Sequence, residues 1–518
     1  MADRAGPKQA TKAIIGPWHL SCGVLIALLF VLALPDLLSP PISPTILRQT
    51  QTYILTRHFG EAGFSLAGLY TDMNGPVPLH LVYEFPLYNF AVGLLFAVFG
   101  PAFFWGKLVS LIASITGLLI LLHLLRTRWS ESVAIRAGLF YVSCPIALLL
   151  AASFQPDAVA MVFMFGSLAL LGRWQNGNGL GHWAWFCLLL LAAGLTKFPV
   201  LVPYVPLIVG AVLWRDRRWR IPRIVELALA IAIFVVPFVG WYLYRARLMT
   251  PESLVGEQSA FLIGDLSRFL HAGFYVKPGF IVGAMVCCGV GLVPAAFGLR
   301  GLEPAGRLLA AGVPLYFVVI PTAADQTYYA YPLVPIFALL LGRGLWRLEQ
   351  FAPARHRGWV RGLFAAAWIA GLAVVAPYTL RHDNVTLAAA TAVRRVSGPD
   401  DLLFVMNMHD RGVGIGLLNS SIVTLAERRG WNVRFEAPSV AVLLPQIEAR
   451  RQAGARWLVA TWYTQDLDPW FTPFLPASFS RCPRFADQPV DGHGLAEQLA
   501  LHYPIVVQGL NFAVLRLE

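Results

Sequence analysis

Residues 74–87, NGPVPLHLVYEFPL, are the stretch around which the rest of the chain is interpreted. The stretch is rich in proline, and it carries one carboxylate, Glu84, immediately before an apolar run. The segment RQTQT begins upstream at Arg48, and Lys107 follows downstream, within strongly apolar surroundings. Charge is costly near lipid, so ionisable groups at a membrane boundary need a physical reason. We therefore treat this stretch as a candidate functional loop.

The composition is that of a membrane protein. Of the 518 residues, 57% are hydrophobic and 13% are charged, whereas soluble domains carry about 25% charged residues. The net charge of +12 does not indicate nucleic-acid binding, because the arginines cluster between apolar runs, as positive-inside anchors do. The six cysteines show neither a disulfide framework nor a zinc-binding spacing.

The apolar runs predict an α-helical polytopic membrane protein with about 11–13 spans. The segments expected to span are residues 18–38, 103–125, 133–152, 157–173, 182–196, 198–214, 224–243, 278–299, 308–323, 328–346 and 363–379. Residues 86–100 are apolar but short, and we expect a re-entrant or interfacial helix there. No small-residue cleavage pattern follows the basic N-terminus, which favours a retained first span over a signal peptide.

The basic segments set the expected orientation. If they are cytoplasmic, an odd number of spans places the first loop, residues 39–102, and the C-terminal region outside. We divide the chain into a membrane domain at residues 1–380 and a soluble extracytoplasmic domain at residues 381–518. A second outer loop, residues 245–277, is amphipathic and is a candidate cover for a site.

Two regions have readable local patterns. Residues 43–59 predict an amphipathic helix on the membrane surface. Its apolar stripe is Ile46, Tyr53, Ile54 and Phe59, and its polar side is Arg48, Gln49, Gln51 and Arg57. The C-terminal region predicts an α/β domain, with helices at 385–396 and 442–453, strands at 401–406 and 457–460, and a terminal hairpin or strand at 506–517.

Carboxylates in the first loop are candidates for acid–base chemistry. Glu84 is either a solvated residue at a loop end or a general base or metal ligand beside apolar walls. Asp72 is a second catalytic candidate, although Thr71 to Gly75 also resembles an ordinary turn. Lys107 is either a snorkelling interface lysine or a phosphate contact that acts together with Arg48 or Arg57.

Three later segments place polar groups on the same expected outer side. Asp157 begins a span. It is either a carboxylate that interacts favourably with the helix dipole or part of the polar wall of a sugar pocket. Lys197 lies between two apolar runs. It is either a hydrated residue at the corner or a cation with a function. The segment that contains Asp325, Gln326, Tyr328 and Tyr329 is either an aromatic belt or a surface for sugar stacking and phosphate hydrogen bonds.

The ordered motifs resemble the GT-C membrane glycosyltransferases, near their protein O-mannosyltransferase and aminoarabinose transferase branch. The resemblance rests on Glu84-Phe-Pro-Leu-Tyr88, Gly106-Lys-Leu-Val-Ser110, Gln155-Pro-Asp-Ala158, Leu195-Thr-Lys-Phe-Pro199 and Tyr328-Tyr-Ala-Tyr-Pro-Leu333. It implies inverting transfer of a hexosyl or pentosyl group from a polyprenyl-phosphate donor to a glycan, lipid or protein of the cell envelope. It further implies a bacterial inner (plasma) membrane location, with a multi-pass chain and a periplasmic C-terminal domain.

The resemblance also assigns roles to residues, with two departures. Arg48-Gln49 stand where many relatives carry Asp-Glu, and Glu84 replaces the lysine of a Lys-Pro-Pro-Leu-Tyr loop. These exchanges imply that Glu84 is the base and Arg48 a phosphate contact, with Asp72 and Asp157 as further catalytic candidates. The substrate-binding residues implied are Arg48, Gln49, Gln51, Arg57, Tyr88, Lys107, Lys197, Asp325, Gln326, Tyr328 and Tyr329.

Three points are left open by the sequence. The motifs require no metal, yet a divalent ion at Glu84 is compatible with them. A transporter or flippase of lipid-linked sugars is an alternative, although the candidate residues lie at the outer boundary and no internal repeat is visible. A non-catalytic envelope scaffold that binds glycan is the other alternative.

Overall fold

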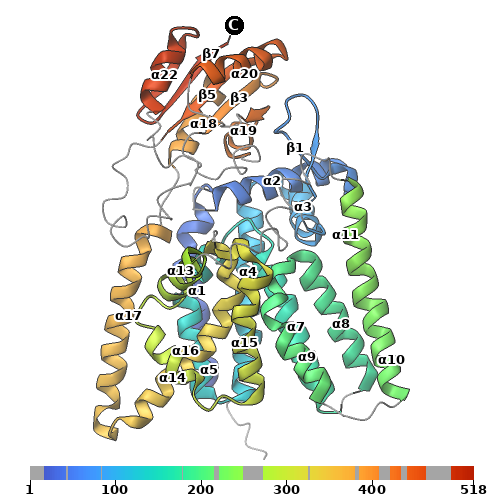
Figure 1. Ribbon diagram of the computed structural model, residues 1–518, viewed down its shortest axis with the longest axis vertical. Coiled ribbons are helices and arrows are strands. Elements are labelled where there is room, and N and C mark those ends of the chain that lie inside the picture. The colour runs from blue at the N-terminus through green and yellow to red at the C-terminus, as the bar shows by residue number, and fades with distance from the viewer. Residues whose placement is uncertain are drawn as a thin grey trace, which may run out of the picture.

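A computed structural model shows a bundle of helices with a sheet-containing domain at one end (Figure 1). Helix α2 lies across that end of the bundle, beneath the sheet domain. The structure describes residues 17–41, 45–82, 84–177, 179–214, 221–248, 272–324, 327–379, 384–407, 420–432, 440–462 and 492–517. The domain boundary expected at residue 380, and most of the expected cover at residues 245–277, lie outside these ranges.

Among the described residues, seven helical segments are long and apolar enough to cross a membrane. They are α1 (Pro17–Leu38), α4 (Phe103–Arg128), α7 (Asp157–Gln175), α8 (Gly179–Thr196), Ile224–Leu248 with α10 (Ile221–Ala230) and α11 (Val236–Leu248), Tyr328–Phe351 with α16 (Val334–Phe351), and Ala354–Val375 within η9 (Ala354–His356) and α17 (Arg357–Thr379). Helices α5 (Glu131–Ser143) and α6 (Pro145–Ala151) form an eighth span if the bent pair counts as one. The prediction of a polytopic helical membrane protein is confirmed.

Within the described ranges, fewer segments are full-length spans than the eleven expected, because several apolar runs are broken. The expected span 133–152 bends by 68° between α5 and α6, where Pro145 begins a new helix. Three other runs form shorter apolar helices: Phe198–Trp214, Phe274–Val286 and Pro304–Val319. Hydropathy measures the length of an apolar run, and it does not register a proline break within that run.

The run 86–100 forms a short helix, α3 (Leu87–Phe99), of 13 residues. Such a helix is about 20 Å long, which is less than the roughly 30 Å of a hydrocarbon core. Its length therefore agrees with the expected re-entrant or interfacial helix. Helix α2 (Ile46–Glu61) packs against α3 on the bundle side.

The C-terminal region is an α/β domain, as predicted. Its five-stranded sheet has the order β4-β3-β5-β7-β6, with β3 parallel to β4 and β5, and β7 antiparallel to both of its neighbours. The strands are β3 (Leu402–Asn407), β4 (Arg429–Asn432), β5 (Ala455–Thr461), β6 (Ile505–Gly509) and β7 (Phe512–Arg516). The helices are α18 (Asn384–Val396), α19 (Ser421–Ala426), α20 (Val440–Gln452) and α22 (Gly492–Ala500). The sequence did not predict β4, α19 or α22.

The first loop is packed between the bundle and the C-terminal domain. One apolar core contains Leu195 and Trp241 of the bundle, Phe59 of α2, and Leu403 and Ile422 of the sheet domain. A small hairpin of β1 (Tyr70–Thr71) and β2 (Leu79–His80) projects from the loop beside α19 (Figure 1). This shared core fixes the loop relative to both parts of the chain.

Residues 43–59 contain the expected helix, but part of its polar side is not at the surface of the protein. The helix exists as α2, but Gln49 and Gln51 are buried, with exposed fractions of 2% and 4%. Helix α19 of the C-terminal domain contacts α2, and Thr50 meets Ser420 and Ser421 there. The part of the polar face that carries Gln49 and Gln51 therefore meets protein, whereas Arg57 remains partly exposed.

Candidate active site

Two cations from distant parts of the chain converge on Glu84. Arg48 of α2 pairs through Nη2 with Oε1 of Glu84, and the ammonium of Lys197 lies 2.9 Å from the same oxygen. Lys197 also lies 3.9 Å from Oδ2 of Asp157 and 5.5 Å from the ring centroid of Tyr329. The structure thus joins five residues that the sequence singled out, and we call them the Glu84 cluster.

Pro199 shapes the corner between α8 and the following helix, where Lys197 lies. Helix α8 ends at Thr196, and Lys197 has extended dihedral angles of φ −161° and ψ 94°. Pro199 has no N–H to donate to the carbonyl of Leu195, four residues earlier. The N–H of Phe85 donates to that carbonyl instead, at 2.9 Å. The residue after Glu84 is thereby tied to the corner that presents Lys197.

The cluster is largely shielded from water. The exposed fractions of the side chains are 12% for Arg48, 20% for Glu84, 3% for Lys197 and 4% for Asp157. Burial alone would raise the pKa of Glu84, but the positive charges of Arg48 and Lys197 outweigh it and lower the pKa to about 2. Glu84 is therefore a carboxylate at neutral pH, and its charge is held by two fixed cations.

Asp157 contributes a carboxylate oxygen that lies 3.9 Å from the ammonium of Lys197 but accepts no hydrogen bond from the described residues. It lies in the first turn of α7, after Pro156, where the helix dipole favours negative charge. Its Oδ2 is buried and has no hydrogen-bond partner within the part of the chain that the structure describes. Oε1 of Gln155 and Oγ1 of Thr196 share this state. Leaving such atoms unsatisfied costs about 1–3 kcal/mol each, so a ligand that donates hydrogen bonds would be favoured here.

Lys107 lies outside the cluster. Its ammonium donates to the carbonyls of Asp36, Ser39 and Pro40 at 2.6, 2.7 and 3.3 Å. These bonds account for its three N–H donors and satisfy carbonyls at the C-terminal end of α1. The structure therefore gives Lys107 a helix-capping role, and the predicted phosphate contact has no geometric support.

Other predicted residues support the cluster from nearby. Oε1 of Gln49 accepts from the N–H of Phe154 at 3.0 Å, and Oε1 of Gln51 accepts from Arg48 at 3.5 Å. The hydroxyl of Tyr88 donates to the carbonyl of Gly106 at 2.9 Å. The contacts of Gln49 and Tyr88 hold α2 and α3 against the bundle, and the contact of Gln51 lies within α2 and orients Arg48.

The remaining candidates are distributed as follows. Tyr328 packs against Tyr329, with ring centroids 4.7 Å apart, next to Lys197. Arg57 pairs with Glu61 on the more exposed side of α2, at 2.8 Å. The carboxylate of Asp72 lies 3.1 Å from Nε2 of His58 and 3.6 Å from Nε of Arg429, in the C-terminal domain. Asp325 and Gln326 lie outside the described residues.

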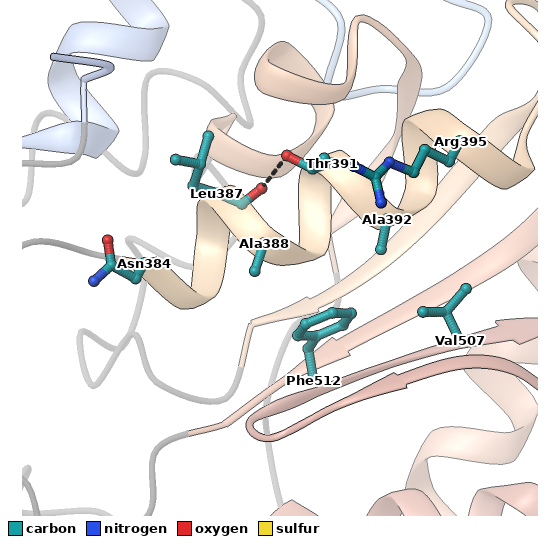
Figure 2. Close-up of a pocket in the computed structure, with 8 residues that line it drawn as sticks. All are labelled: Asn384, Leu387, Ala388, Thr391, Ala392, Arg395, Val507 and Phe512. Atoms are coloured by element: carbon teal, nitrogen blue, oxygen red, sulfur yellow. Dashed lines mark hydrogen bonds between the residues drawn. The ribbon is translucent and has the colours of Figure 1, made fainter.

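A separate open cavity of about 460 Å³ lies in the C-terminal domain (Figure 2). It runs between α18 and the β6–β7 hairpin, where Val507 and Phe512 face the helix. Its lining is Asn384, Leu387, Ala388, Thr391, Ala392, Arg395, Val507 and Phe512. The lining includes no carboxylate and no member of the Glu84 cluster, so this cavity is not the candidate active site.

No metal centre is defined by the side chains that the structure describes. Within those ranges, no three His, Cys, Asp or Glu residues group closely enough to hold an ion. A divalent ion at Glu84 would have to compete with Arg48 and Lys197 for the same carboxylate. Metal dependence stays an untested prediction.

The helical bundle with an α/β domain at one end agrees with the GT-C-like fold expected from the motifs, and part of the chain matches a glycosyltransferase family model. The family model for dolichyl-phosphate-mannose-protein mannosyltransferases matches residues 83–241, a segment that includes Glu84, Asp157 and Lys197. No curated protein sequence matches the chain.

Three solved structures of membrane proteins share the fold of this chain at low sequence identity. ArnT from Cupriavidus metallidurans bound to undecaprenyl phosphate is 15% identical, with a TM-score of 0.60 over 97% of this chain and 98% of that one. AglB from Archaeoglobus fulgidus, in complex with an inhibitory peptide and a dolichol-phosphate, is 11% identical, with a TM-score of 0.50 over 86% and 69%. The mycobacterial arabinofuranosyltransferase AftD is 15% identical, with a TM-score of 0.51 over 86% of this chain and 36% of that one.

Proposed function

We propose that the chain is a glycosyltransferase that moves a sugar from a polyprenyl-phosphate donor to a cell-envelope acceptor at the outer face of the bacterial inner membrane. The observation that carries the proposal is the convergence of Arg48 and Lys197 on one oxygen of Glu84. A fixed, shielded pair of cations matches the geometry of a phosphate. The similar ArnT and AglB structures, which hold undecaprenyl phosphate and a dolichol-phosphate, support this ligand class.

In this proposal, Glu84 occupies the place of the phosphate until the donor binds. The donor phosphate displaces the carboxylate from Arg48 and Lys197. As the bond between the sugar and the phosphate breaks, negative charge grows on the leaving oxygen, and the two cations stabilise it. Preorganised charges of this kind act strongly because water is largely excluded from the site.

The displacement also makes Glu84 a better base. With both cations in contact, its pKa of about 2 makes it a poor proton acceptor at neutral pH. Once the phosphate engages the cations, the effect of burial remains, and burial raises the pKa of a carboxylate. Glu84 then takes the proton of the acceptor hydroxyl, whose oxygen attacks the anomeric carbon as polyprenyl phosphate leaves. A single displacement inverts that carbon.

The unpartnered acceptors give the sugar a place to bind. Oδ2 of Asp157, Oε1 of Gln155 and Oγ1 of Thr196 are buried and accept no hydrogen bond from the described residues. Sugar hydroxyls are donors that would satisfy them. The ring of Tyr329, beside Lys197, offers an apolar surface next to these acceptors.

Reconstituted vesicles with labelled polyprenyl-phosphate sugars test the proposal. The wild-type protein is expected to transfer label to an envelope extract, and Glu84→Gln is expected to lose that transfer. Movement of the intact labelled lipid across the bilayer without transfer would identify a flippase. Binding of glycan with neither reaction would identify a scaffold, and either result would contradict the proposal.

A further inference from the structure

The tip of the first loop is hydrogen-bonded to the edge of the sheet of the C-terminal domain. Strand β4 is an edge strand of that sheet. The N–H of Gly430 donates to the carbonyl of Asp72 at 3.0 Å, and the N–H of Gly75 donates to the carbonyl of Gly430 at 2.8 Å. Asn74 and Trp431 form an antiparallel bridge at the same place. The loop thus covers backbone groups that an edge strand otherwise leaves unpaired.

Side chains extend this contact to α2. Both carboxylate oxygens of Asp72 lie 3.1 Å from Nε2 of His58, on α2, and Oδ1 lies 3.6 Å from Nε of Arg429, on β4. Eight residues before His58, Thr50 meets the hydroxyls of Ser420 and Ser421 at 3.2 and 3.3 Å. The C-terminal domain therefore contacts α2 directly at Thr50 and indirectly, through Asp72 of the first loop, at His58. The two points lie about 12 Å apart along the helix axis.

Arg48 lies on α2 two residues before Thr50. Its partner Glu84 is tied independently to the bundle, through Phe85 and the corner at Lys197. The ion pair between Arg48 and Glu84 therefore joins a helix contacted by the C-terminal domain to a segment held by the bundle. A displacement of α2 would separate Arg48 from Lys197 and so disrupt the cation pair.

We infer that the C-terminal domain positions the cation pair of the membrane domain, and that Asp72, Gly75, Arg429 and Trp431 are positioning residues for it. The catalytic consequence rests on the function proposed above, whereas the contact itself does not. The four residues touch neither Glu84 nor Lys197 in any contact found among the described residues. They act through α2.

Gly75 offers a sharp test of this inference. It has φ +64°, and a Cβ atom there would lie 2.0 Å from Cζ2 of Trp431. Gly63, in the same loop, has φ +63°, with nothing within 4 Å of the position of its Cβ. Gly75→Ala therefore adds a clash with the C-terminal domain to the backbone strain, whereas Gly63→Ala adds the strain alone. Gly63→Ala is the matched control.

The experiment combines hydrogen–deuterium exchange of the full chain in nanodiscs with binding of polyprenyl phosphate. Exchange measures the local opening of α2 and does not depend on catalysis. Gly75→Ala is expected to speed exchange in both β4 and α2 relative to Gly63→Ala. It is also expected to weaken polyprenyl phosphate binding by about tenfold or more, because a displaced Arg48 would lose its charge-assisted hydrogen bond to the phosphate.

Arg429→Glu provides a second variant, because Arg429 is 51% exposed and its replacement need not disturb the sheet core. Its control is Arg451→Glu, an exposed arginine of the same domain that pairs only within α20 in the contacts described. Arg429→Glu is expected to give a smaller change in the same direction as Gly75→Ala, and Arg451→Glu no change in α2.

Each outcome decides one of the two proposals. Faster exchange in α2 together with weaker phosphate binding supports the inference. Unchanged exchange in α2 for both Gly75→Ala and Arg429→Glu overturns it. Faster exchange in α2 with unchanged phosphate binding overturns the link to the cation pair. Absence of polyprenyl phosphate binding by the wild-type protein contradicts the proposed function, and the exchange data then still decide whether the domain holds α2.

Discussion

Replacing Glu84 with glutamine should strengthen the binding of polyprenyl phosphate while abolishing sugar transfer. In the structure, Glu84 holds both cations that we assign to the donor phosphate. The amide keeps the size of the side chain but carries no charge. The phosphate would then meet two cations that no carboxylate neutralises, and the acceptor hydroxyl would meet no base. Opposite effects on binding and turnover are a specific signature of this mechanism.

The pKa of Glu84 sets the magnitude of the binding effect. The cations and the surroundings lower this pKa from 4.5 to about 2. Since a tenfold change in a proton equilibrium is about 1.4 kcal/mol, the site favours the charged carboxylate by about 3 kcal/mol. The donor has to replace that interaction in the wild-type protein but not in Glu84→Gln. We therefore expect polyprenyl phosphate to bind about 10- to 100-fold more tightly to the variant.

The assay is a titration of polyprenyl phosphate into nanodiscs that contain either protein, paired with transfer of a labelled sugar. Loss of a general base should slow transfer by about 10²- to 10⁴-fold. Glu61→Gln is the control, because Glu61 lies on the same helix α2, is 53% exposed and pairs with Arg57. Weaker or unchanged phosphate binding in Glu84→Gln would refute the exchange of carboxylate for phosphate. Retained transfer would refute the assignment of the base.

Three further predictions concern the stability of the folded protein. Lys197→Met should destabilise the protein by about 3 kcal/mol, because it leaves the charge of the buried Asp157 uncompensated. Thermal unfolding in a double-mutant cycle checks this, since adding Asp157→Asn should recover part of the lost stability. Lys107→Met should lower stability by about 2 kcal/mol, because it loses the hydrogen bonds to the carbonyls of α1. Its affinity for polyprenyl phosphate should be unchanged, and a large loss of affinity at wild-type stability would contradict the capping role. The folded-state pKa of Glu84 is depressed, so its stabilising contribution is complete above about pH 4.5 and disappears as the pH falls toward 2. Acid titrations of unfolding should therefore differ between the wild-type protein and Glu84→Gln over that interval.

Much of the cluster was predictable from local sequence. Glu84, Asp157 and Lys197 each interrupt or begin an apolar run, and charge at a membrane boundary is rare enough to be informative. The positive-inside pattern then placed them on one expected side of the membrane. The structure adds that an irregular backbone near Pro86 and Pro199 brings Glu84 and Lys197 together.

The partners of each group were not predictable, because they depend on tertiary contacts. Lys107 begins an apolar run much as Asp157 does, yet its acceptors are carbonyls at the end of α1, about seventy residues earlier. The polar face of α2 resembled a solvated surface because its cover, α19, lies some 370 residues later in the chain. Periodicity reports which residues share a face, and it does not report what that face contacts.

A cryo-electron microscopy structure of the chain with bound polyprenyl phosphate would test the central claim most directly. The account predicts that the phosphate lies within hydrogen-bond distance of both Arg48 and Lys197, and that Glu84 has moved off these cations toward the acceptor side. A phosphate bound at Lys107 or in the C-terminal cavity, with Glu84 still paired to Arg48 and Lys197, would contradict it.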